Sequence, residues 1–218
     1  MIAFEPTEDQ QLILGTVTEF ARSNLTPRAR EFEKARPVPP DLRRAAQEMA
    51  PGMAHVPESI GGQGLGLLTA VLINEELAYG DAAAPFGLPG FGAYTLAALE
   101  LGTEEQARRL IGPFTDPVRE TFGAVAWSER VANRERPGFA TTAKASGDGW
   151  ELTGQKCFVA NAALAESFIV FAQVDPTLGW NGIGAFVVSR DNPGLRVGER
   201  HTTLGLDCAS FSELTVKA

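Results

Sequence analysis

The chain has 218 residues, of which 44% are hydrophobic and 21% charged, the proportions of an ordinary globular protein. Its formal net charge of −8 excludes the clustered basic surface that nucleic-acid binding requires, so we expect no nucleic-acid partner. No apolar run is long enough for a membrane span and no signal-like segment opens the chain, so we expect a cytoplasmic protein without membrane contact. The two cysteines, Cys157 and Cys208, have no cluster of ligand residues around them, which predicts buried free thiols and no metal site.

The first half of the chain carries helical patterns. Thr7 and Gln10 stand three residues apart behind Pro6, which predicts a capping box at the start of a helix. Apolar residues then recur at helical spacing as far as Leu25. Further helices are predicted behind Pro39-Pro40, over about 67–79, over about 91–101, and from a second capping box at 103–106 to near 114.

A glycine-rich loop separates the second of these helices from the third. Four glycines fall within residues 61–66, which forbids regular structure and predicts a tight turn. The loop could cradle a ligand or let two helices approach closely, and we favour the structural turn. It lacks the Gly-Lys-Ser/Thr ending of a phosphate-binding P-loop.

The pattern changes after Asp116-Pro117. Short strand-like runs follow at 122–128, 140–146, 150–160, 167–174, 184–189, 195–200 and 211–217. Gly147-Asp148-Gly149 is typical of a hairpin turn, because these residues tolerate the positive φ that tight connections demand. The sequence therefore predicts an N-terminal helical domain over 1–120 and a β-domain over 121–218.

The order of elements and several local patterns resemble the acyl-CoA dehydrogenase family. The stretches that carry the resemblance are 56–65, 74–78, 102–106 and, above all, 154–162, Gly-Gln-Lys-Cys-Phe-Val-Ala-Asn-Ala. The last stands where the family has a Gly-x-Lys-x-aromatic-Ile-Thr-Asn strand, at the expected distance from 126–129, which matches the family's Thr-Glu-Pro segment. The resemblance covers the whole chain. It implies an α+β fold, an N-terminal all-helical domain followed by a small antiparallel β-barrel, with the family's C-terminal four-helix bundle absent from this sequence.

The chemistry that the resemblance implies is α,β-dehydrogenation of an acyl-CoA thioester, with FAD as cofactor. A carboxylate removes the α-proton while the β-hydride moves to the flavin, and the protein orients and tunes the cofactor. The resemblance also implies an electron-transfer flavoprotein as partner and an oligomeric assembly.

The family's flavin contacts carry over to six positions. Phe158 stands where an aromatic side chain packs on the flavin, and Ser128 offers a hydroxyl and an N–H to the polar edge of the ring. Ala126, Trp127, Val159 and Ala160 line the same face. Ala160 replaces a threonine whose hydroxyl donates to the flavin, a loss worth about 1 to 3 kcal/mol.

Arg134 falls in the loop that touches flavin and thioester in the family, at the position of a serine. It is a candidate substrate contact, and the alternative is a surface arginine without a ligand.

The family's general-base glutamate lies in the bundle, so we assign no catalytic residue to this chain and expect it to be inactive alone. Two hypotheses remain open. The chain is part of an oxidoreductase completed by a C-terminal bundle or by a partner chain that supplies one, or it is a non-catalytic homologue that acts as a binding or scaffold subunit.

Overall fold

The computed structural model describes residues 5–34, 38–90, 92–130 and 137–217. The chain forms two compact units. One comprises Met1–Glu120 together with Thr203–Ala209, and the other comprises Thr121–Thr202 together with Ser210–Ala218. Residues 203–209, which lie inside the range predicted for the β-domain, thus belong to the helical unit.

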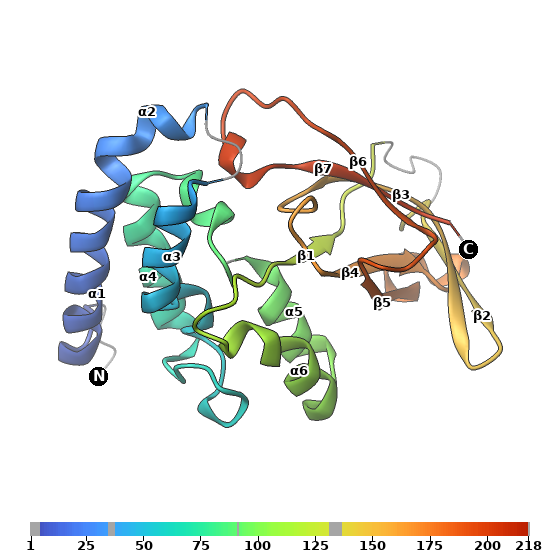
Figure 1. The fold of residues 1–218 in the computed structure, drawn as a ribbon. Helices are drawn as coiled ribbons and strands as arrows, with labels where there is room; N and C mark the ends of the chain where they lie inside the picture. The colour runs from blue at the N-terminus through green and yellow to red at the C-terminus, as the bar shows by residue number, and fades with distance from the viewer. Residues whose placement is uncertain (1–4, 35–37, 91, 131–136, 218) are drawn as a thin grey trace. The chain divides into compact units, whose positions relative to one another are not determined.

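The helical unit follows the predicted order closely. Its α-helices in the described ranges are α1 (Glu8–Phe20), α2 (Ala29–Phe32), α3 (Pro40–Met49), α4 (Gly66–Gly80), α5 (Ala93–Leu101) and α6 (Glu104–Ile111), shown in Figure 1. Both capping boxes form: the Thr7 hydroxyl accepts from the Gln10 N–H and the Gln10 side chain accepts from the Thr7 N–H, and Thr103 with Gln106 repeats the arrangement. The short helix α2 had no signal in the sequence.

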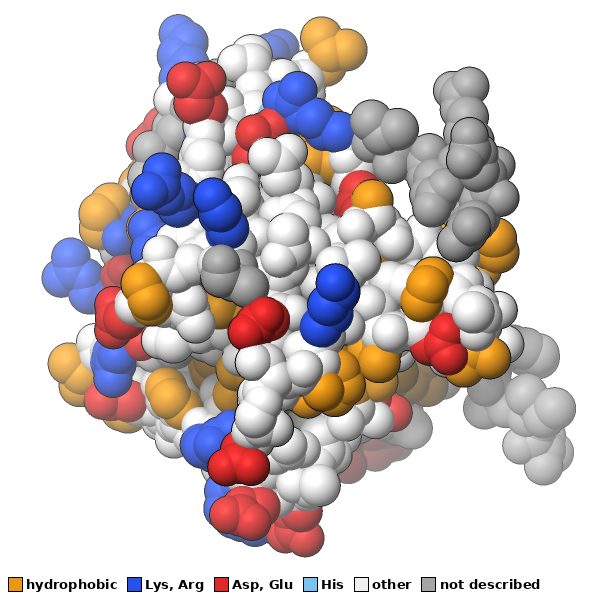
Figure 2. Space-filling model, turned by 90° about the vertical axis from the view of Figure 1, so that its right-hand side faces the viewer, with side chains coloured by type: hydrophobic (Ala, Val, Ile, Leu, Met, Phe, Trp, Pro, Cys, Tyr) orange, Lys and Arg blue, Asp and Glu red, His pale blue; other side chains and the backbone are white. Residues whose placement is uncertain are grey.

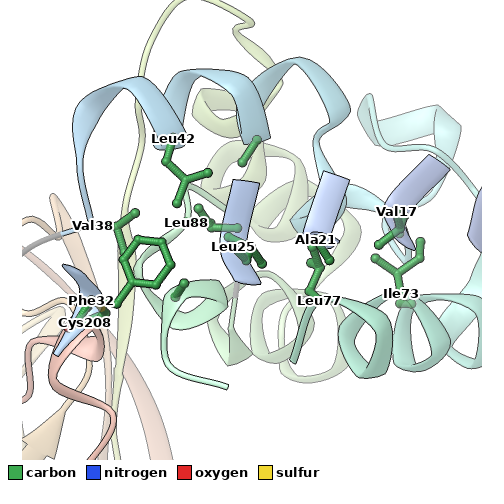
Figure 3. Close-up of a cluster of buried hydrophobic side chains, with 14 residues drawn as sticks. Val17, Ala21, Leu25, Phe32, Val38, Leu42, Ile73, Leu77, Leu88 and Cys208 are labelled. Carbon is green, nitrogen blue, oxygen red and sulfur yellow. Dashed lines mark hydrogen bonds between the residues drawn. The ribbon is translucent and has the colours of Figure 1, made fainter. Parts of the chain in front are cut away.

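The core of this unit lies between α1 and α4. Val17, Ala21 and Leu25, from α1 and the π-helical turn that continues it, point toward Ile73 and Leu77 of α4 (Figure 3), and all five are at least 98% buried. The i, i+4 spacing of the first three places them on one helix face, and burial of each large aliphatic side chain stabilises by about 1.5 to 3 kcal/mol.

A distant segment completes this core. Cys208 lies beside Phe32 (Figure 3), and its Sγ is 3.2 Å from the Phe32 carbonyl oxygen. Both cysteines are free and buried, as the sequence predicted.

The glycine-rich loop closes on its own backbone. The N–H groups of residues 61–65 donate in turn to the carbonyls of Glu58, Pro57, Met53, Val56 and Ala54. A Cβ on Gly62 would lie 2.1 Å from the Val56 carbonyl oxygen, so only glycine fits there. Because these five donors are already used, the loop is a structural turn and they are not available to cradle a ligand.

The second unit is a curled sheet. Its strands are β1 (Gly123–Ala126), β2 (Thr142–Ser146), β3 (Gly149–Val159), β4 (Ser167–Gln173), β5 (Ile183–Ser189), β6 (Leu195–Arg200) and β7 (Ser212–Val216). The order is β1-β4-β2-β3-β7-β6, with β5 paired to β4. The predicted α+β class is confirmed. In detail the sheet is mixed rather than wholly antiparallel, because β1 runs parallel to β4.

The β2–β3 hairpin (Figure 1, yellow) turns where the sequence predicted. Ser146 pairs with Gly149 across a two-residue turn in which Gly147 has φ +56°. One face of the sheet is apolar, and its buried side chains include Ala126, Val159, Phe168 and Leu214.

Large hydrophobic side chains also reach the surface. Figure 2 draws one face, on which acidic and basic side chains lie near one another with hydrophobic ones between them. Leu12, Val118 and Leu204 are among the exposed residues. Singly scattered exposed hydrophobic residues are normal in folded proteins, so their exposure by itself assigns no partner surface.

Candidate functional site

The end of β1 and the end of β3 bring three exposed candidate residues together. After β1, the chain continues through Trp127 and Ser128 alongside β3, where the Cys157 N–H donates to the Ser128 carbonyl at 2.8 Å. Phe158 is the next residue. Trp127 is 47% exposed and Phe158 54%, and Ser128 is exposed as well. We call Trp127, Ser128 and Phe158 the exposed edge.

Phe158 owes its exposure to an irregularity in β3. The pairing of β3 with β7 shifts register between Lys156 and Val159, and Phe158 itself has φ +52°, which is unusual for a bulky residue. Lys156, Cys157 and Val159 are buried, so within this stretch the bulge turns only Phe158 outward. Strain of this kind costs about 1 to 3 kcal/mol and is concentrated at functional sites.

The Phe158 ring rests on His201, with ring centroids 4.5 Å apart and an interplanar angle of 30°. Phe211 approaches from another side at 6.3 Å. The His201 N–H donates to the Phe211 carbonyl at 2.7 Å, which ties the two supports together. Phe158 therefore presents one ring face to its supports and leaves more than half of its surface open.

Ser128 has two hydrogen-bonding groups, its hydroxyl and its N–H, that the described residues leave unused. Its carbonyl accepts from Cys157, but among the described residues neither its hydroxyl nor its N–H has a partner. Two free donor groups beside an exposed aromatic ring match the needs of a planar heteroaromatic ligand with a polar edge, such as an isoalloxazine.

A buried ion pair lies behind the exposed edge. Lys156 is 1% exposed, and its Nζ donates to Glu129 Oε1 and to the Trp127 carbonyl, both at 3.0 Å. The Nζ also lies 3.5 Å from the centre of the Phe139 ring, within reach of a cation–π interaction. Glu129 in turn accepts from the N–H groups of Ala140, at 2.7 Å, and Thr141, at 2.9 Å.

Burial and these contacts shift the pKa values of both Lys156 and Glu129. Burial lowers the pKa of Lys156 below its ordinary value, and the neighbouring Glu129 carboxylate only partly opposes this. Burial by itself would raise the pKa of Glu129, but hydrogen bonds from Thr141, Ala140 and Lys156 outweigh it, and the pKa lies below its ordinary value. A carboxylate so fully hydrogen-bonded is a poor general base.

Trp127 belongs to an aromatic cluster. Its ring meets Phe139 and Phe171 edge to face, at centroid distances of 4.9 and 4.7 Å. Trp180 lies parallel to it at 6.4 Å, with an interplanar angle of 5°. The cluster fixes the indole of Trp127 on the side of the sheet opposite to Ala126, which is fully buried in the apolar core.

The remaining predicted site residues are placed differently. Ala126 and Val159 are completely buried, so their side chains cannot touch a ligand. Ala160 is half-buried, and Arg134 lies outside the described residues. Lys156, Glu129 and Trp180 were not predicted as parts of the site. The available signal was a lysine at a strand position inside the 154–162 stretch.

Other kinds of site find no support in the described ranges. No group of three or more His, Cys, Asp or Glu residues there could hold a metal ion. None of the helices described is both long and apolar enough to cross a membrane.

Two protein-family models match the chain. The acyl-CoA dehydrogenase N-terminal domain matches residues 7–116, and the acyl-CoA dehydrogenase middle domain matches residues 124–218. Among curated relatives, the mitochondrial short-chain specific acyl-CoA dehydrogenase of Bos taurus is 32% identical over 96% of this chain and 51% of its own length. A probable acyl-CoA dehydrogenase of Mycobacterium leprae (strain TN) is 30% identical over 97% of this chain and 54% of its own length.

Solved structures are also similar to this chain. The butyryl-CoA dehydrogenase of Megasphaera elsdenii has a TM-score of 0.81 and 28% identity, over 99% of this chain and 57% of that chain. A structure described as the electron transferring flavoprotein of Acidaminococcus fermentans has a TM-score of 0.82 and 29% identity, over 99% of this chain and 57% of that chain. The chain thus spans about half the length of the relatives that it matches. On the strength of both domain matches, this chain belongs to the acyl-CoA dehydrogenase family.

Proposed function

We propose that the chain forms part of the flavin-binding wall of an FAD-dependent acyl-CoA dehydrogenase, with the exposed edge against the flavin ring. The observation that carries the proposal is that two donors on Ser128, beside the exposed ring of Phe158, have no partner among the described residues. Family membership supports the choice of FAD, since one similar solved structure is described as an FAD-dependent dehydrogenase.

The residues fit the cofactor, and each has a separate task. FAD, when bound, supplies the acceptor for the hydride that leaves the β-carbon of an acyl-CoA thioester. The Ser128 hydroxyl and N–H hold a polar edge of the ring, and Phe158 packs on the ring and excludes water from it. Ala160 brings no hydroxyl, so its side chain adds packing but no hydrogen bond. No described residue is assigned the proton abstraction, because both Glu129 oxygens are occupied.

The remaining partners are proposed from the relatives. Relatives named as acyl-CoA and butyryl-CoA dehydrogenases support an acyl-CoA thioester as the substrate, with Arg134 as a candidate contact. The similarity to a structure described as an electron transferring flavoprotein supports such a protein as the electron partner. The general base and the rest of the pocket come from a C-terminal helical bundle, on the same protein or on a partner chain, within an oligomer.

Flavin titration tests the proposal. We expect added FAD to bind the chain with a change in its absorbance bands. Ser128→Ala and Phe158→Ala should each weaken binding about tenfold, which corresponds to about 1.4 kcal/mol. Ser23→Ala and Trp150→Ala are the matched controls, since both are exposed and lie outside the exposed edge. Equal affinity in all four variants would show that the flavin binds elsewhere.

The alternative is a non-catalytic homologue that serves as a binding or scaffold subunit. Ala160 favours it, because the hydroxyl expected from the family motif is missing. Correctly folded chain that takes up no FAD, alone or with a bundle-bearing partner, would favour this alternative.

A further inference from the structure

The three consecutive residues 127–129, of which the first two belong to the exposed edge, are each held by a hydrogen bond from β3. The Lys156 Nζ holds the Trp127 carbonyl, the Cys157 N–H holds the Ser128 carbonyl, and the Glu129 side chain is held by Lys156 together with two N–H groups. Every anchor from β3 comes from the two residues directly before Phe158. The strand that carries the exposed ring is therefore also the strand that fixes the backbone of Ser128.

We propose that Lys156 is a positioning residue, which holds Ser128 at a fixed place relative to Phe158 by clamping the carbonyl of Trp127 and the carboxylate of Glu129. Its side chain reaches from β3 to the segment that follows β1, two parts of the sheet that are not adjacent strands in the ladder order. Neither contact of the lysine engages the N–H or the hydroxyl of Ser128, which have no partner among the described residues and so can meet a ligand.

A purely stabilising role explains these contacts less well. A buried ion pair is commonly no more stabilising than apolar residues of the same volume, since desolvation of both charges offsets their attraction. Here the ammonium makes three directed contacts, to a carboxylate, a carbonyl and the Phe139 ring, and two of them fix the segment 127–129. Directed contacts of this kind determine geometry, which is what an aligned binding edge requires.

Loss of the lysine should change the protein even when no ligand is bound. If Lys156 clamps the segment, its loss frees the Ser128 carbonyl from Cys157 and the Glu129 carboxylate from Ala140 and Thr141. The amide hydrogens of these three donors then exchange faster with solvent. Lys156→Met tests this, since methionine fills most of the volume of the lysine stem and carries no ammonium.

Native-state hydrogen exchange is the first measurement. We expect Lys156→Met to speed exchange at Cys157, Ala140 and Thr141 at least tenfold more than at the β4 amides. Leu195→Ala is the control, because Leu195 is buried in the apolar core of the same unit and lies in β6, which pairs with β7. Unchanged exchange at the three amides, or the same increase in the control, would overturn the proposal.

Lys156→Met leaves Glu129 as an unpaired buried charge and so risks unfolding the sheet. The double variant Lys156→Met/Glu129→Gln removes both charged groups of the pair, so no unpaired charge is left buried and the measurement stays possible. We expect faster exchange at Cys157 in this variant too, because the Trp127 carbonyl is still released. Wild-type protection at Cys157 in the folded double variant would contradict the clamp.

Flavin affinity is the second measurement, and this part rests on the proposed function. We expect Lys156→Met to weaken FAD binding about tenfold in the wild-type background and less than threefold in Ser128→Ala, because the lysine acts through the serine. Additive losses would mean that Lys156 only stabilises the fold. If wild-type chain binds no FAD, the proposed function fails, while the exchange measurement still decides the positioning.

Discussion

The charged Glu129 carboxylate makes its hydrogen bonds inside the protein. Its side chain is 8% exposed, and its oxygens accept from one ammonium and two backbone N–H groups. Hydrogen bonds to the ionised form hold its pKa below the ordinary value of 4.5, against the effect of burial. The folded chain therefore binds this proton more weakly than the unfolded chain does, which makes the stability of the β unit depend on pH.

The direction of that dependence follows from the lowered pKa. The contribution of Glu129 is complete above pH 4.5 and is lost as the pH falls through the folded pKa. We expect the free energy of unfolding to fall with pH below 4.5, and to fall less in Glu129→Gln. Urea unfolding followed by tryptophan fluorescence measures it, since all three tryptophans lie in the β unit.

Glu151→Gln serves as the control for that titration, because Glu151 is exposed and its carboxylate accepts from the exposed Ser146 hydroxyl rather than from a buried ammonium. It should keep the wild-type pH profile. A Glu129→Gln profile that falls as steeply as wild type would show that other carboxylates carry the acid sensitivity.

At the scale of elements, two glycines differ in the space around them, so replacing each by alanine should have opposite effects on stability. Gly62 sits in the closed loop, where a Cβ would lie 2.1 Å from the Val56 carbonyl oxygen, whereas Gly15 is exposed within α1 with nothing within 4 Å of an added Cβ. We expect Gly62→Ala to cost about 1 to 3 kcal/mol through overpacking, and Gly15→Ala to stabilise by about 1 kcal/mol through helix propensity.

Far-UV circular dichroism during urea unfolding compares the two variants, because the helices dominate that signal. A neutral Gly62→Ala would mean that the loop can open away from Val56, and the interpretation of a closed structural turn would then be wrong. A destabilised Gly15→Ala would point instead to a hidden contact on the outer face of α1.

The elements were largely predictable from the sequence, and the site only in part. Capping residues, apolar period and turn residues are local signals, which is why α1, α6 and the β2–β3 hairpin lie where they were expected. Phe158 and Ser128 were named through the resemblance to the family, but their proximity depends on a bulge that has no local signature. The Lys156–Glu129 pair joins residues 27 positions apart, and only the folded sheet reveals it.

At the scale of the whole chain, too, local patterns predict what is near in the sequence and miss what is distant. The change of period after Asp116-Pro117 predicted a boundary at residue 120, and the first compact unit runs to Glu120 before the second begins at Thr121. Residues 203–209 return to the helical unit because Cys208 packs beside Phe32, 176 residues away in the sequence. A pairing at that distance leaves no periodic trace, so pattern analysis could not assign this segment.

Each compact unit contains one cysteine, and the two thiols offer independent reports on the whole molecule. Cys208 is fully buried in the helical unit, and Cys157 is 2% exposed in the β unit. Burial also raises the pKa of the Cys157 thiol above its ordinary value, which reduces the reactive thiolate. A thiol reagent should therefore reach each cysteine only when its surroundings open.

We expect both thiols in native buffer to react at least about a hundredfold more slowly than in urea, which corresponds to an opening free energy of roughly 3 kcal/mol. Mass spectrometry of the labelled chain, with Cys157→Ala and Cys208→Ala to assign each rate, makes the measurement. Gly62→Ala should speed labelling of Cys208, because it destabilises the unit in which that thiol is buried. Labelling of Cys208 at its urea rate in native buffer would mean that residues 203–209 detach from the helical core, and the return of the chain to that unit would then not persist in solution.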